Sequence, residues 1–191
     1  KEGNFNEALT YFDYAVDQNS KEYTAYFYRA YTKERLNDYS GAISDYEIVI
    51  NLNPTFSNSY NNIGLIKRIQ GDNKAALSNY NLGLGYNPNN SLIYANRGFL
   101  KFELEDYEGA LIDYNKSLKI NPKFSKVYAL RGILFLIDVF RDYQKALDDL
   151  NIAIDLNPND KEFYKIRSSI REKLGDKKGS DEDLNQVKKF N

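Results

Sequence analysis

The chain has 191 residues, 42% of them hydrophobic and 28% charged, and its formal net charge is −1. So small a net charge gives no attraction to nucleic acid or to an anionic membrane, and we expect neither as a partner. Cysteine and histidine are absent, which excludes disulfides, thiolate nucleophiles and the commonest general base and metal ligand. We therefore expect no cofactor, no metal site and no catalytic residue.

The first element that the sequence predicts is a helix within residues 1–22, where Ala8, Phe12 and Ala15 follow helical spacing. We interpret it as the second helix of a truncated repeat, and we expect that a part of the protein precedes it. Asn-Pro pairs then recur down the chain, with prolines 34, 34 and 36 residues apart. The pairs are Asn53-Pro54, Asn87-Pro88, Asn121-Pro122 and Asn157-Pro158.

A period of this length is typical of a stacked solenoid of short structural units. Residues 1–191 are therefore predicted to form a single solenoid domain. Its five repeats are residues 23–56, 57–90, 91–124, 125–160 and 161–191. The fourth repeat carries two extra residues near Asp138–Arg141, and we expect them to lengthen its first helix or the turn that follows.

Each repeat has the pattern of two helices joined by a polar turn. In the third, Glu105-Asp106 precedes a run in which Leu111, Tyr114 and Leu118 follow helical spacing. Asp before that run is a favourable helix cap. Small residues recur at position 8 of the repeats, where two helices can then cross closely. They are Ala30, Gly64, Gly98, Gly132 and Ser168.

Small residues at positions 8 and 20, a large residue at 24 and proline at 32 resemble the tetratricopeptide repeat (TPR) family. The resemblance extends over essentially the whole chain. It implies an all-α, right-handed α-α superhelix of about eleven helices. It also implies a protein-binding scaffold, with no catalytic activity, whose first helices line a concave groove.

Arginine and aspartate recur together in four of the five repeats. Position 7 is Arg29, Arg97, Arg131 and Arg167, and position 23 is Asp45, Asp113, Asp149 and Asp183. The second repeat replaces both at once, with Ile63 and Asn79. This joint replacement predicts that each arginine pairs with the aspartate of its own repeat. A row of arginines that binds an acidic ligand is the alternative.

By the family resemblance, positions 6 and 9 of the first helices face the groove. The side chains there include aromatic rings, suited to stacking on a peptide, and amides, suited to hydrogen bonding its backbone. Asn62 and Asn96, one repeat apart, are predicted to hold an extended peptide in this way. We predict a partner-binding set of Tyr28, Tyr31, Asn62, Asn96, Phe99 and Ile133.

The predicted function is that of a scaffold or adaptor that binds a partner protein or an extended peptide in the groove. Two alternatives stay open. In one, the array selects substrates for a catalytic part that lies upstream; in the other, it associates with itself. The second alternative draws on the apolar stretch Ala129–Phe140, which is otherwise interpreted as packing between the fourth and fifth repeats.

Overall fold

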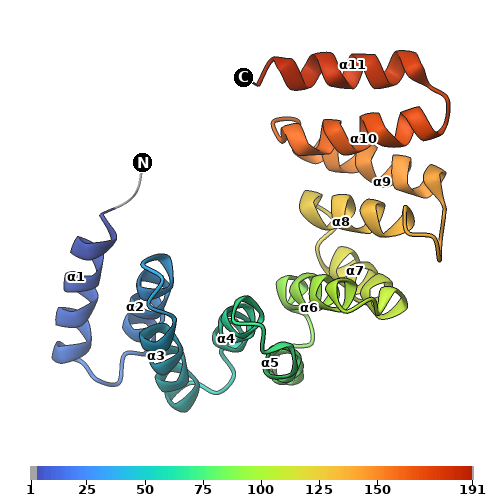
Figure 1. Ribbon diagram of the computed structural model, residues 1–191. Helices are drawn as coiled ribbons and strands as arrows, with labels where there is room; N and C mark the ends of the chain where they lie inside the picture. Colours follow the sequence, from blue (N-terminus) through green and yellow to red (C-terminus); the bar gives the residue numbers. More distant parts are fainter. Residues whose placement is uncertain (1–3, 191) are drawn as a thin grey trace. The chain divides into compact units, whose positions relative to one another are not determined.

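The computed structural model describes residues 4–190, which form eleven α-helices and no β-strand (Figure 1). This confirms the predicted all-α fold. The helices of the first half are α1 (Phe5–Gln18), α2 (Tyr23–Arg35), α3 (Tyr39–Leu52), α4 (Ser57–Ile69), α5 (Asn73–Tyr86) and α6 (Ser91–Glu103). They are followed by α7 (Tyr107–Ile120), α8 (Ser125–Phe135), α9 (Tyr143–Leu156), α10 (Lys161–Lys173) and α11 (Lys177–Lys188).

The helices belong to two compact units, one that runs up to Asn96 and one that starts at Arg97, so the boundary falls within α6. In the first unit, α1 packs against α2, α2 against α3, α3 against α4 and α4 against α5. In the second unit, the same holds from α7 to α11, and Figure 1 shows α10 and α11 side by side as a hairpin. Whether residues 1–191 are one solenoid domain stays a prediction.

Five second helices begin at an aspartate cap, as the sequence predicts. In each, a side-chain oxygen of the aspartate accepts the backbone N–H three residues later, at 2.9–3.0 Å. This bond satisfies one of the N–H groups that a helix start leaves without a partner. The capping residues are Asp38, Asp72, Asp106, Asp142 and Asp176.

Replacing Asp106 by alanine is expected to lower the free energy of unfolding by about 1 kcal/mol, because the N–H of Gly109 then loses its acceptor. Urea titration followed by circular dichroism measures the change. Asp106→Asn is the control, since an asparagine oxygen caps a helix about as well. Equal losses in the two variants would show that the cap does not stabilise the helix.

Four second helices, α3, α5, α7 and α9, end at the Asn-Pro pairs, and the turns between the two helices of a repeat use left-handed backbone. The φ angles are 62° at Asn37 and Glu105, and 80° and 81° at Gly71 and Gly175. In the fourth repeat the two extra residues lengthen the turn and not the helix. There α8 stops at Phe135, the turn runs to Asp142, and Arg141 has a φ of 43°.

The small residues at position 8 lie where the two helices of a repeat cross. A methyl group added to Gly64 would lie 2.6 Å from the ring of Tyr80, well inside contact distance. The large residue at position 24 fills the space opposite, and Tyr46, Tyr80, Tyr114 and Leu150 are fully buried. Leu184, at the same position in α11, is 44% exposed, because no later helix of the described chain covers it.

The apolar stretch Ala129–Phe140 belongs mainly to the core of the second unit. Ala129 and Phe135 are buried in a cluster that includes Phe163 of α10, and Leu136 and Phe140 pack against the same cluster. This agrees with packing between the fourth and fifth repeats. Val139 is exposed, at 62%.

Candidate partner-binding surface

The four arginines at position 7 bind the aspartates of their own repeats, which confirms the predicted pairing. Each guanidinium donates through Nε and Nη2 to the two carboxylate oxygens, at 2.6–3.0 Å. The aspartates are at most 4% exposed. A two-pronged bond of this kind fixes the guanidinium in place, so these arginines hold helices together and are not a row open to a ligand.

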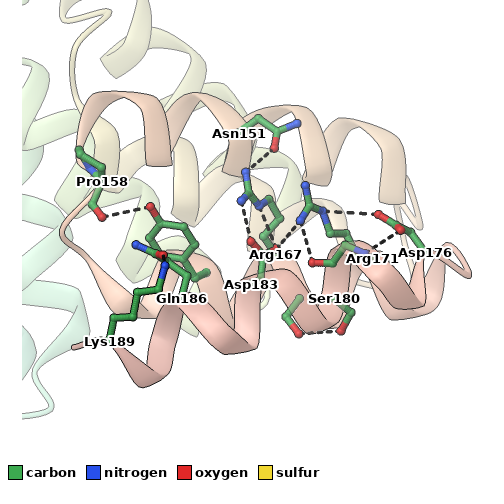
Figure 2. A network of polar contacts seen from close by, with 12 residues as sticks. Asn151, Pro158, Arg167, Arg171, Asp176, Ser180, Asp183, Gln186 and Lys189 are labelled. Atoms are coloured by element: carbon green, nitrogen blue, oxygen red, sulfur yellow. Dashed lines mark hydrogen bonds and ion pairs between the residues drawn. The ribbon is translucent and has the colours of Figure 1, made fainter. Parts of the chain in front are cut away.

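Three of these arginines also donate to a side chain of the preceding repeat, namely Arg29, Arg131 and Arg167. Figure 2 shows Arg167 between Asp183 of its own repeat and Asn151 of α9, whose side-chain oxygen accepts at 2.9 Å. Arg171 adds a second cation to Asp183, at 3.0 Å, and also contacts Asp176. Arg167 thus links three helices, since from α10 it bonds to the buried carboxylate of Asp183 in α11 and to Asn151 in α9.

Tyr28 and Tyr31 lie three residues apart on α2, and so on the same face of that helix. Both are accessible, at 53% and 42% exposure. Tyr28 stacks on the ring of Phe12 in α1, with centroids 5.8 Å apart. The hydroxyl of Tyr31 accepts a hydrogen bond from Arg35 at 3.3 Å. Each tyrosine is thus held by one contact while about half of its side chain stays accessible to solvent.

Asn62 and Asn96 belong to one chain of hydrogen bonds in the first unit. Asn96 donates to the side-chain oxygen of Asn61 at 2.8 Å, and Asn61 donates to that of Asn62 at 3.0 Å. Asn62 in turn donates to the Tyr46 hydroxyl at 2.9 Å, and that hydroxyl donates to Glu34 at 3.1 Å. The chain fixes the orientation of both predicted amides, which are half-buried.

Burial affects the protonation of Tyr46 and Glu34, the two residues at the end of this hydrogen-bond chain. Desolvation raises the pKa of Glu34, and the bond from Tyr46 and the charge of Arg35 oppose that rise. Burial also raises the pKa of the Tyr46 hydroxyl, which therefore stays protonated and acts as the donor to Glu34. Because the Tyr46 hydroxyl donates to Glu34, it accepts from the Asn62 amide N–H. The Asn62 oxygen then accepts from Asn61, and the Asn61 oxygen accepts from Asn96.

Phe99 and Ile133 line one small cavity in the second unit, of about 60 Å³. Its other walls are Phe102, Tyr114 and Leu130. The six predicted residues thus lie at three places: the tyrosines on α2, the amides on α4 and α6, and the cavity beside α7 and α8. Their role in binding stays a prediction.

The sequence argument missed Glu34, Tyr46 and Asn61, which organise the amides. The sequence did contain a signal for Glu34 and Tyr46. Glu34 occupies position 12, and its counterpart two repeats on is Phe102, while the counterpart of Asn62 is Leu130. Polar residues therefore occupy these two positions beside Tyr46 and apolar ones occupy them beside Tyr114, and this contrast distinguishes the two sites.

Comparison with known families and structures agrees with this geometry. Residues 1–55, 57–90 and 91–124 each match a tetratricopeptide repeat model, and together these matches span well over half of the chain. The chain belongs to the tetratricopeptide repeat family. Among curated proteins, none matches its sequence significantly.

Solved structures show the same fold at low sequence identity. MamA from Desulfovibrio magneticus RS-1 is 17% identical with a TM-score of 0.72, over 88% of this chain and 94% of its own. PilF from Pseudomonas aeruginosa is 15% identical with a TM-score of 0.81, over 88% of this chain and 76% of its own. YrrB, described as a TPR protein with an unusual peptide-binding site, is 15% identical with a TM-score of 0.68, over 94% of this chain and 91% of its own.

The class of protein is therefore that of TPR scaffolds for protein interactions, a fold that is generally non-catalytic. In the described part of the chain, no helix has the length and apolar character needed to cross a membrane.

Proposed function

We propose that this protein binds an extended segment of a partner protein against positions 6 and 9 of its first helices, which we call the first-helix face. The residues in contact are Tyr28, Tyr31, Asn62, Asn96, Phe99 and Ile133. The protein itself carries out no catalysis and serves as the scaffold on which the partner is held.

The observation that carries the proposal is the fixed orientation of the two amides. A primary amide has two N–H donors and an oxygen with two lone pairs. Asn62 gives one donor and one lone pair to its neighbours in the hydrogen-bond chain, and Asn96 gives one donor. Each keeps at least one donor and one acceptor for a peptide unit. Because the amides are already oriented, little side-chain entropy is lost when a peptide binds.

The exposed rings of Tyr28 and Tyr31 support the same proposal. A tyrosine contributes a large contact area with few rotatable bonds and a polar tip that pairs readily. Both rings are held by contacts with Phe12 and Arg35, so their positions are also set before a partner arrives. The first-helix face thus combines stacking with backbone hydrogen bonding, the two means by which a protein holds an extended peptide.

Two other functions are less well supported. Self-association through the apolar stretch Ala129–Phe140 has one exposed large apolar side chain in its favour, Val139, while most of that stretch is used in packing. A substrate-selecting module of a larger enzyme would bind its substrate on the same first-helix face. It differs from a scaffold only in having a catalytic part elsewhere in the protein.

Selection of a random-peptide display library tests the proposal. The unaltered protein is expected to enrich peptides with a common sequence pattern, and the Asn62→Ala/Asn96→Ala variant is expected to lose that enrichment. Asn6→Ala/Asn79→Ala is the matched control, since it removes two amides from the second helices α1 and α5 of the same unit.

The proposal fails if no peptide is enriched. It fails equally if the control variant loses as much enrichment as the Asn62/Asn96 variant, because the loss then comes from general damage to the fold. Light scattering across a range of concentrations identifies the self-association alternative directly.

A further inference from the structure

Gly85, next to the last residue of α5, is a glycine that the packing of the chain does not explain. Glycine within a helix is unfavourable relative to alanine, so a helical position that keeps one usually has a packing or functional reason. At every other glycine in the part of the chain that the structure describes, either φ is positive or an added methyl group would crowd a nearby side chain. At Gly85 φ is not positive, and an added methyl group would meet no neighbouring group within 4 Å. The glycine thus leaves open a space that the described chain does not fill.

This space belongs to an open hollow of about 480 Å³ on the surface of α5. The residues that line it all come from that helix, so the hollow lies on the first unit alone. They are Ser78, Asn81, Leu82, Gly85 and Tyr86. About half of the Leu82 side chain is accessible, and the same is true of Tyr86, whose ring stacks on that of Tyr60 with centroids 5.3 Å apart. A protruding leucine and an unfilled space therefore lie three residues apart on one exposed helix face.

The face has no charge. Between Lys74 and Arg97 the sequence contains no charged residue, and this is the longest uncharged run in a chain of which 28% is charged. In α7, the two positions that correspond to those of the leucine and the glycine are Lys116 and Lys119. A two-fold contact places a surface against its own copy, so a charged face repels itself and an uncharged one does not. The charge pattern of α5 therefore favours a second copy of this chain over a charged partner.

We propose that α5 is the contact surface of a dimer, in which two copies of α5 cross in opposite directions and Leu82 of each copy lies over Gly85 of the other. A two-fold axis that passes between these two residues exchanges them, so a single leucine and a single glycine supply both halves of the contact. The absence of a side chain at Gly85 lets the second helix approach closely. The inference goes beyond the proposed function, since it uses a second helix and none of the residues proposed to bind the peptide.

The dimer is expected to be weak and reversible, because contact through one helix face buries little surface. Two copies together present two first-helix faces. A partner with two binding segments is then held more tightly than either face alone holds one segment.

Sedimentation velocity of the full chain over a range of concentrations measures the dimerisation constant. Gly85→Ala is expected to weaken the dimer about tenfold or more, because the added methyl group takes the space of Leu82 in both halves of the contact. The same substitution is expected to raise the urea midpoint of unfolding, because alanine favours a helix. General damage to the fold cannot produce these two opposite effects.

Leu82→Lys and Gly85→Glu test the pairing itself. Each variant alone is expected to be monomeric, because its new charge would be buried at the contact without a partner. A mixture of the two is expected to associate again. The new lysine of one copy then faces the new glutamate of the other, while the second contact between Leu82 and Gly85 is unchanged.

Val139→Lys is the control, since it alters the exposed side chain of the stretch Ala129–Phe140 and leaves α5 as it is. It is expected to dimerise like the unaltered chain. The inference is overturned if the unaltered chain stays monomeric up to about 1 mM, if Gly85→Ala dimerises as tightly as the unaltered chain, or if the mixture does not associate. Loss of the dimer in Val139→Lys and not in Leu82→Lys overturns it as well, and assigns self-association to the other stretch.

Discussion

Replacing Asp113 by alanine is expected to lower the free energy of unfolding by about 3–5 kcal/mol, the loss found when one partner of a buried ion pair is removed. Asp113 is 1% exposed and neutralises two cations, Arg97 at 2.7 Å and Lys101 at 2.9 Å. Without the carboxylate, both cations lose the counter-charge that it supplies. Urea titration followed by circular dichroism measures the loss.

The chain itself supplies the control for this prediction. The second repeat has Ile63 and Asn79 at the positions of Arg97 and Asp113, and Lys67 at that of Lys101. The double variant Arg97→Ile/Asp113→Asn copies that arrangement and is expected to recover most of the stability, because both charges of the two-pronged pair are removed together. A loss below about 1 kcal/mol for Asp113→Ala, the range of exposed pairs, would contradict the account. So would a double variant no more stable than the single one.

Tyr46→Phe is expected to destabilise the protein by about 1–3 kcal/mol. The substitution removes one oxygen from a fully buried ring. The Asn62 amide then has no acceptor at 2.9 Å, and the Glu34 carboxylate loses a donor at 3.1 Å. Leaving such groups without partners costs more than the hydrogen bonds themselves contribute.

Tyr114→Phe is the matched variant, since it removes the same atom at the same position of another repeat. Its hydroxyl has no partner to lose, so the free energy of unfolding is expected to stay the same or to rise by up to about 1 kcal/mol. Thermal or urea unfolding of the two variants side by side decides the matter. Equal losses would show that the two hydroxyls have equivalent surroundings, against the structure.

The helical framework was predictable from the sequence because its signals repeat. Asn-Pro follows four of the second helices, and an aspartate such as Asp106 caps the start of five of them. Signals that recur in phase so often leave little room for another interpretation. The pairing of Arg97 with Asp113 was predictable for a different reason. Ile63 and Asn79 replace both partners at once, and a single unpaired change would have left a buried charge.

The finer structure of the surface could not be predicted in the same way. The link from Asn96 through Asn61 to Asn62 depends on side-chain rotamers, and Asn61 has no counterpart of its own type at its position in the other repeats. The longer turn of the fourth repeat was predicted only as one of two options, because two extra residues can extend a helix or a loop. Within the described part of the chain, the Tyr114 hydroxyl has no hydrogen-bond partner because Phe102 and Leu130 stand where Glu34 and Asn62 stand beside Tyr46. A search for recurring motifs overlooks such an absence of polar residues.

Photocrosslinking of an enriched peptide tests the central claim, that the partner lies on the first-helix face. Benzoylphenylalanine is placed singly at Tyr28 and at Phe99 on the first helices α2 and α6, and at Tyr11 and at Ile112 on the second helices α1 and α7. Tyr11 and Ile112 are 68% and 67% exposed, so access does not limit them. The account predicts crosslinks from Tyr28 and Phe99 alone. Crosslinks from Tyr11 or Ile112, with none from the first helices, would contradict it.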